Sequence, residues 1–250
     1  MGKIPIGLQL YSVREACAAN LPGTLAAVAK MGYEGVEFAG YHGRSAAELR
    51  AMLDDVGLRC CGTHIALDTL LGNELPRTVE FNRVLGNKYL IVPGLPEARR
   101  NSAAAWRETA RLFNDIAARL APYGMYTGYH NHHIEFQPMD GEIPWDIFFA
   151  NTSREVVMQL DTGNARHGGA DPAAILARYP GRARVVHLKE YSASKDKVVI
   201  GEGDEDWPRI FALCETTGGT EWYVVEEESY PYPPLESVRR CIAYLRGMGK

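Results

Sequence analysis

Short apolar runs alternate with amphipathic helical patterns from one end of this chain to the other. Eight runs predict strands, at residues 4–11, 35–38, 59–64, 88–92, 125–130, 156–160, 184–188 and 222–226. Helical periodicity lies between them, for example at 22–31, 45–56, 103–120, 171–179, 207–214 and 235–248. Strict alternation demands parallel strands joined by right-handed crossovers. Eight such units in 250 residues predict an α/β protein with a closed (β/α)8 TIM barrel, a single domain over residues 1–250.

Local signals at the expected helix ends agree with this alternation. Ser45 and Glu48 form a capping-box pattern at the start of one expected helix, and Gly57 follows its end. An open doubly wound sheet is the alternative architecture. Such a sheet usually has a glycine-rich turn after its first strand, where a nucleotide binds. The segment Gln9 to Arg14 has no such turn, so the barrel is favoured.

Composition excludes several classes of protein. The net charge of −4 comes from mixed signs without a basic block, which argues against a nucleic-acid partner. The five cysteines form no CxxC pair, as is typical of reduced thiols in a cytosolic protein. The chain shows neither a secretory signal nor an apolar run long enough to span a membrane. We therefore expect a soluble, cytoplasmic protein that acts on a small molecule without a membrane partner, and a homo-oligomer is allowed.

Residues of metal-ligand type stand where the expected strands end. At these positions the chain has Glu37, His64, His130, His132, Gln159, Asp161, His187 and Glu226. The carboxyl ends of parallel strands meet at one mouth of a barrel, which is where α/β enzymes place their sites. The pattern predicts a metal enzyme.

The densest cluster is His130-Asn131-His132-His133. On a strand, side chains two residues apart share a face, so His130 and His132 are expected to point one way and His133 the other. The alternative is a histidine-rich strand end whose rings are only hydrogen-bonded to their neighbours. Two roles are likewise possible for Asp161. Its carboxylate either reaches the barrel mouth or caps the following turn.

The last two strands add a histidine, a lysine and three carboxylates. His187 and Lys189 share a face, where the imidazole suits a metal and the lysine suits a substrate oxygen. Glu226 directly follows an apolar run and is expected to point inward, whereas a solvated loop is the alternative for Glu227. Glu37 and His64 either complete the polar ring or serve as structural groups held by hydrogen bonds.

Taken together, these segments resemble the xylose isomerase-like (β/α)8 superfamily, and within it the sugar phosphate isomerase/epimerase group. The resemblance implies one divalent ion (Mn, Co, Mg or Zn) held by residues after strands five to eight. Carried over by motif, the ligands are Asp161, His187 and Glu226, with His130 standing where relatives have a glutamate. This departure leaves Glu226 and His130 as candidate catalytic bases. Lys189, His64 and His132 are then expected to hold substrate oxygens, and Glu37, Gln159 and Asn164 either contact the substrate or support the ligands from behind.

The activity implied is that of an isomerase or epimerase of a sugar or cyclitol, which removes a proton next to a carbonyl through an enediolate. A lyase or dehydratase acting on a keto-sugar, a 3-keto-glycoside or an inosose is the alternative, because one strong base suffices for elimination. An AP endonuclease-like phosphodiesterase would need a fuller ligand set and a basic face. A sugar-binding barrel without catalysis is the last alternative.

Overall fold

Eight parallel strands form a nearly closed barrel in the computed structural model, which describes residues 2–250. The strands are β1 (Ile6–Gln9), β2 (Gly35–Ala39), β3 (Arg59–His64), β4 (Tyr89–Val92), β5 (Tyr126–His130), β6 (Val157–Gln159), β7 (Val185–Leu188) and β8 (Trp222–Val225). They pair in the order β6-β5-β4-β3-β2-β1-β8-β7. A parallel bridge between Asp161 and His187 links the two ends of this sheet, and the His187 amide donates to the Leu160 carbonyl at 2.9 Å. The predicted single-domain (β/α)8 TIM barrel is confirmed.

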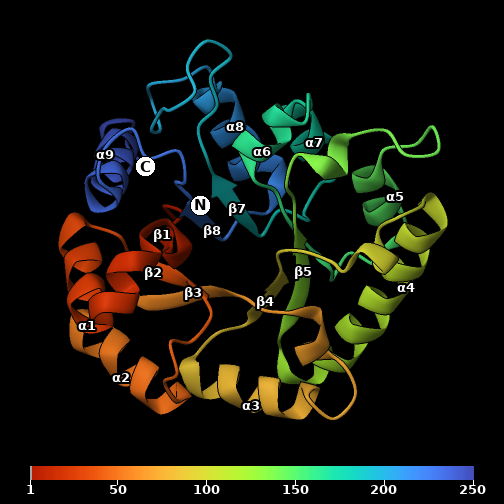
Figure 1. Ribbon diagram of the computed structural model, residues 1–250, viewed down its shortest axis with the longest axis horizontal. Helices are drawn as coiled ribbons and strands as arrows, with labels where there is room; N and C mark the ends of the chain where they lie inside the picture. The colour runs from red at the N-terminus through yellow and green to blue at the C-terminus, as the bar shows by residue number, and fades with distance from the viewer. Residues whose placement is uncertain (1) are drawn as a thin grey trace.

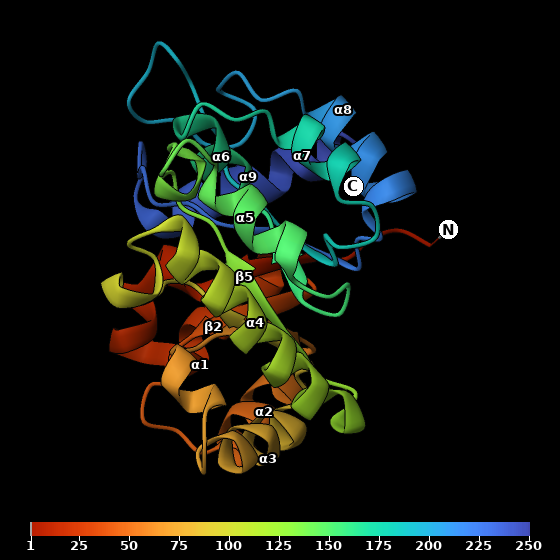
Figure 2. The same ribbon diagram turned by 90° about the vertical axis from the view of Figure 1, so that its right-hand side faces the viewer.

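Helices surround the strands on all sides (Figure 1). They are α1 (Arg14–Met31), α2 (Ala46–Val56), α3 (Leu75–Leu85), α4 (Ala103–Leu120), α5 (Pro144–Asn151), α6 (Thr162–His167), α7 (Pro172–Arg178), α8 (Trp207–Leu213) and α9 (Pro234–Gly247). Helix α9 contacts β8 and the 3-10 turn η1 (Leu10–Val13), so the last element packs beside the first. The N-terminal segment and the C-terminus consequently lie near each other in both views (Figure 2).

The predicted helix boundaries hold where the capping signals are strong. Ser45 and Glu48 form a complete capping box at the start of α2, and Gly57 closes the helix at φ 74°. Helix α1 begins earlier than the predicted 22–31, since its first half starts at Arg14. A non-helical Asn20 separates the two halves, and its side chain accepts a hydrogen bond from the Gly23 amide at 3.1 Å.

The first strand is shorter than predicted. It ends at Gln9, where the expected strand at 4–11 continues to residue 11. The Gln9 side-chain oxygen accepts a hydrogen bond from the Tyr11 amide at 3.0 Å, which stabilises the turn η1 in place of further extended backbone.

Two apolar clusters lie on opposite faces of the strands. The larger one fills the space between the barrel and its helices. The smaller one comes from β3, β4, β6, β7 and β8 and fills the barrel interior, with Val157, Val185 and Val224 among its members. Two residues after these valines the chain has Gln159, His187 and Glu226. Because side chains on a strand alternate between faces, the apolar interior is capped by a polar layer at the carboxyl end.

Among the helices of residues 2–250, we find none that combines the length and the apolar character needed to cross a membrane.

Candidate metal centre

Side chains from four adjacent strands converge at the carboxyl end of the barrel. Ligand atoms of His130, Asp161, His187 and Glu226 all lie within 4.8 Å of one another, and all four residues are buried. Nδ1 of His187 lies 2.5 Å from Oε2 of Glu226, and Nε2 of His130 lies 3.9 Å from the same oxygen. The structure thus brings together the four side chains that the sequence nominated as ligands.

The charges of this centre are set by burial and by His187. Burial lowers the pKa of His130 well below its ordinary value, so its imidazole is neutral. Burial would also lower the pKa of His187, but the carboxylates of Glu37 and Glu226 raise it to about 10. Burial raises the pKa of Asp161 to about 7. The imidazolium of His187 therefore balances the carboxylates on either side of its ring.

Two buried atoms of the centre have no hydrogen-bond partner: Nδ1 of His130 and Oδ2 of Asp161. Leaving such an atom unsatisfied costs about 1–3 kcal/mol. A divalent cation accepts lone pairs from imidazole nitrogen and carboxylate oxygen, and a set of two imidazoles and two carboxylates suits Mn, Co, Fe or Zn. The residues present therefore fit the metal that the sequence implies.

Glu37 lies one layer below the centre and is fully buried. Its carboxylate accepts hydrogen bonds from Nε2 of Gln9 at 2.8 Å and from Nε2 of Gln159 at 2.7 Å. It also lies 2.5 Å from Nε2 of His187, on the side of the ring away from Glu226. A carboxylate on the far nitrogen is the usual means of orienting a histidine that binds a metal. Glu37 thus fixes the ring of His187, and Nδ1, which bonds Glu226 in this structure, would become a ligand by exchanging its proton for the cation.

A β-bulge makes room for this carboxylate. Between β2 and β3 the pairing shifts, because Val36 pairs with Cys60 whereas Glu37 pairs with Gly62. A Cβ atom at position 62 would collide with the Glu37 carboxylate, so only glycine fits there. Gln159 completes the layer, since its Oε1 lies 2.7 Å from Nε2 of His64. Of the two roles expected for Glu37 and Gln159, the structure favours support of the ligands, because both side chains are buried and neither lines the cavity.

Asp161 is braced by two asparagines. The Asn131 side chain bonds both backbone groups of Asp161, at 2.8 Å and 3.1 Å. The Asn164 amide donates to Oδ1 of Asp161 at 2.7 Å, which caps α6, and Nδ2 of Asn164 donates to the Asn131 carbonyl at 3.1 Å. The two alternatives for Asp161 are compatible: one oxygen caps a helix while the other has no partner.

A cavity of about 590 Å³ opens directly over the centre. His64, His130 and Glu226 form its floor side, and its lining includes His132, Tyr11 and Glu228. Lys189 stands at its edge, with Nζ 2.5 Å from Oε2 of Glu228 and 3.9 Å from Oε1 of Glu226. A small molecule in this cavity would touch two of the four candidate ligands.

Comparison with known proteins agrees with the architecture. Residues 25–248 match the xylose isomerase-like TIM barrel family. The chain belongs to this family. It is 25% identical to the rhizopine catabolism protein MocC of Rhizobium meliloti, over 83% of this chain and 74% of that protein. It is 26% identical to an inosose dehydratase of Erwinia tasmaniensis, over 88% of this chain and 87% of that enzyme.

A solved structure shows the same barrel. A sugar phosphate isomerase/epimerase from Parabacteroides distasonis superposes on this xylose isomerase-like barrel with a TM-score of 0.84, at 25% identity and over 98% of both chains. The named relatives include an inosose dehydratase and a sugar phosphate isomerase/epimerase. The family therefore supports an isomerase, an epimerase or a dehydratase that acts on a sugar or a cyclitol.

Two glutamates of the barrel mouth have roles that the sequence did not reveal. Glu227 is buried, not part of a solvated loop, because its Oε1 accepts hydrogen bonds from the amides of Ser229 and Tyr230 at 2.7 and 2.8 Å. Glu135, also buried, accepts from the Tyr129 hydroxyl at 2.7 Å and from the His132 amide at 2.8 Å. Both carboxylates fix loops beside the centre, and the closely spaced acids and amides after β5 and β8 were the only signal.

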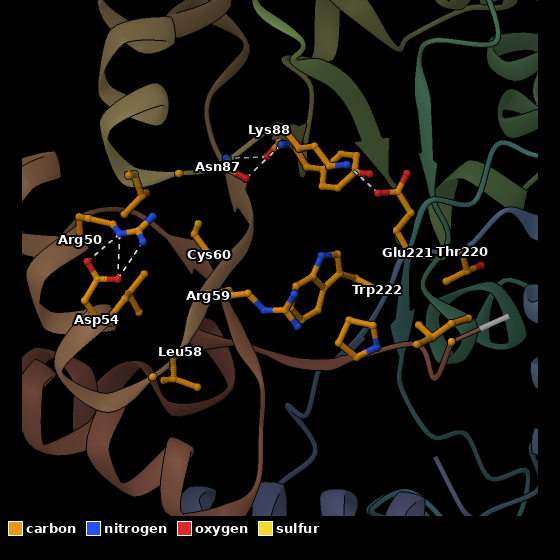
Figure 3. A pocket seen from close by; sticks show the side chains of 18 of the residues that line it. Arg50, Asp54, Leu58, Arg59, Cys60, Asn87, Lys88, Thr220, Glu221 and Trp222 are labelled. Carbon is orange, nitrogen blue, oxygen red and sulfur yellow. Dashed lines mark hydrogen bonds and ion pairs between the residues drawn. The ribbon is translucent and has the colours of Figure 1, made fainter.

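A cavity of about 850 Å³, larger than the one over the candidate metal centre, lies at the amino end of the barrel (Figure 3). Its charges are paired with one another: Arg50 with Asp54 at 2.8 Å, and Lys88 with Glu221 at 2.6 Å. The Arg59 guanidinium lies over the Trp222 ring at 4.5 Å. The two groups of potential metal ligands in residues 2–250 both lie at the other end. Since conserved chemistry in TIM barrels sits at the carboxyl end, we do not assign the active site to this cavity.

Proposed function

We propose that this protein is a metal-dependent enzyme that removes a proton from the carbon next to a carbonyl of a sugar or cyclitol. One observation carries the proposal. Ligand atoms of four buried side chains at the ends of β5 to β8 converge under an open cavity, and Oδ2 of Asp161 in that centre has no partner in the protein. A dication at that position would satisfy this oxygen, and Nε2 of His130 already faces the carboxylate of Glu226 at 3.9 Å.

The cation would be held by His130, Asp161, His187 and Glu226. When bound, it would polarise a substrate carbonyl and the neighbouring hydroxyl, and so make the adjacent C–H more acidic. Glu226 and His130 are the two ligand candidates that also line the cavity. The pKa of Glu226 would rise through burial, but Lys189 and His187 hold it well below its ordinary value, so the group is a carboxylate. Both residues are therefore unprotonated at neutral pH. The second oxygen of Glu226 could accept a proton while the first holds the cation, whereas His130 could accept one only if its lone pair were not on the cation.

Three further side chains are placed to hold substrate oxygens. His64 and His132 line the cavity, and Lys189 donates to Glu228 at its edge. A lysine ammonium beside the reacting carbons stabilises negative charge on oxygen and can return a proton. His64 is itself fixed by Gln159, so a substrate hydroxyl would meet an oriented ring.

A dehydratase or other lyase is the second candidate, and two observations favour it. The curated relatives include inosose dehydratases. The centre also offers one carboxylate that lines the cavity, Glu226, with Lys189 close to it at 3.9 Å. An elimination needs one base for the C–H proton and one acid for the leaving oxygen, and this pair could supply both.

The test is a panel of ketoses, inososes and 3-keto-glycosides incubated with the metal-loaded protein in deuterated water. We expect deuterium in the product of an isomerase or epimerase, and loss of water or of the glycosidic group in the product of a lyase. Mass spectrometry and NMR distinguish the two. A protein that binds metal and sugar but neither labels nor eliminates any substrate would be a sugar-binding barrel, and the proposal would be wrong.

A further inference from the structure

A second cavity, of about 750 Å³, lies beside the one over the metal centre. Its lining includes His133, His167, Tyr191, Ser192, Lys195 and Asp196. Glu228 lines both cavities, and Lys189, its ion-pair partner, lines the second. The Lys189–Glu228 pair therefore marks the boundary between the two compartments. The proposed reaction uses none of the six residues.

Rings of three side chains give this cavity a mixed apolar and polar wall. The ring centroids of His133 and His167 are 6.3 Å apart. Those of His167 and Tyr191 are 5.7 Å apart with planes at 85°. Such rings offer apolar faces to C–H groups and polar edges to hydroxyl groups. A polyhydroxylated ring presents both.

The charges of the second cavity do not favour an anion. Lys195 and Asp196 have opposite signs, and Nζ of Lys195 already donates to the Glu202 carbonyl at 3.0 Å. Lys189 is paired with Glu228 at 2.5 Å. With its two lysines engaged and its carboxylates present, the cavity is matched to a neutral ligand rather than to a phosphate.

The backbone at Tyr191 is held in place by the preceding residue. The buried Glu190 carboxylate accepts hydrogen bonds from the Tyr191 amide at 3.1 Å, the Gly201 amide at 2.7 Å and Nε1 of Trp207 at 2.9 Å. These bonds tie both ends of the loop after β7 to one carboxylate. A wall that is fixed before binding loses little conformational entropy when a ligand arrives.

We propose that the second cavity binds a neutral second sugar ring, joined through a glycosidic oxygen to the ring that lies over the metal centre. The substrate class is then a two-ring glycoside instead of a free monosaccharide. The linking oxygen would lie beside Lys189 and Glu228, where the compartments meet. This inference rests on the proposed function for the chemistry at the first ring, but the binding it predicts needs no turnover.

The test compares disaccharides with methyl glycosides of the same first ring. Gluco- and galacto-configured disaccharides and the matching methyl glycosides are titrated into the metal-loaded protein by calorimetry. We expect at least one disaccharide to bind about tenfold more tightly than its methyl glycoside, as aromatic contacts of this size allow. Tyr191→Ala should abolish that preference and leave the binding of the methyl glycoside unchanged. Tyr123→Ala, at a tyrosine 58% exposed elsewhere, is the matched control and should keep the preference.

Three results would overturn the inference. They are the absence of any preference for a disaccharide, a preference that survives in both Tyr191→Ala and His167→Ala, and competition by inorganic phosphate for the same cavity. Failure of the proposed function is distinguishable: a protein that prefers disaccharides but never exchanges a substrate proton would contradict the reaction and leave the second cavity as proposed.

Discussion

The two ends of this barrel are lined by the same kinds of charged side chain, but they satisfy those charges differently. At the amino end, Arg50 pairs with Asp54 and Lys88 with Glu221, and these side chains are between about a third and a half exposed. At the carboxyl end the charged groups are buried, and His130 and Asp161 each keep an atom without a partner. The amino end has the larger cavity, 850 Å³ against 590 Å³. The convergence of buried metal-ligand side chains, and not cavity size, distinguishes the carboxyl end.

Physical chemistry explains the contrast. An exposed ion pair contributes about 0–1 kcal/mol because water competes for both partners. Buried charges are costly unless they are paired or bind a metal, and His130, Asp161, His187 and Glu226 bring such groups together at one point. The amino end should therefore affect stability weakly, whereas the carboxyl end should decide metal binding and turnover.

The largest contrast is expected from one aspartate at each end. Asp161→Asn removes a charged ligand while keeping the shape, and should lower turnover and metal affinity by at least about a hundredfold. Asp54→Asn breaks only the surface pair with Arg50 and should leave both unchanged. Deuterium exchange measures turnover, and the rise of Tm with added Mn measures metal binding. Equal losses in the two variants would remove the distinction between the ends.

Within the carboxyl end, the adjacent histidines should separate chemistry from binding. His130→Ala should lower kcat by at least about a hundredfold, because it removes a ligand and a candidate base. His133 lies in the second cavity, so His133→Ala should mainly raise KM for the two-ring substrate. Steady-state kinetics of both variants provide the measurement. Identical changes in kcat would refute the assignment of the two rings to different cavities.

Glu37→Gln tests the layer beneath the ligands. The variant keeps the shape but removes the charge that orients His187, so metal affinity should fall by about 10–100-fold. Competition with a chelating dye measures this affinity without any need for turnover. The control is Glu34→Gln, which makes the same substitution at the surface and should bind metal normally. An unchanged affinity in Glu37→Gln would mean that His187 is oriented by other contacts.

The smallest contrast concerns how the free energy of unfolding changes with pH. A carboxyl group at the carboxyl end and one at the amino end should change it in opposite directions. Burial raises the pKa of Glu205, near α8, to about 8. Its contribution to stability is full below the ordinary value of 4.5 and is lost as pH rises through about 8. Burial would also raise the pKa of Glu221 at the amino end, but Lys88 and Arg184 lower it, so its contribution is present above the ordinary value and lost in acid.

Urea unfolding at several pH values distinguishes these signs. Glu205→Gln should gain on the order of 1–2 kcal/mol over the wild type between pH 6 and pH 9, because glutamine cannot ionise. Glu221→Gln should instead be less stable than the wild type at neutral pH, and this difference in unfolding free energy should disappear as pH falls below 4. Unfolding free energies of Glu205→Gln that run parallel to the wild type across pH 6–9 would show that Glu205 ionises normally.

The sequence predicted the barrel and the convergence of the four candidate ligands because both follow from periodicity. Alternation of strand and helix dictates the architecture, and the period of two along each strand places His187 and Glu226 on the interior face. The network of Gln9, Glu37 and Gln159 could not be predicted, since it joins β1, β2 and β6 through a bulge at Gly62 that no local pattern marks. The burial of Glu227 depends likewise on loop amides that only the folded chain provides.

The most direct test of the central claim is elemental analysis of the wild-type protein, grown with Mn, Co and Zn and then dialysed. We expect about one divalent ion per chain, and less than a tenth of that in His187→Ala at the same protein concentration. A wild-type protein that retains no divalent ion, or a His187→Ala variant that retains the full amount, would contradict the metal centre at the carboxyl end of this barrel.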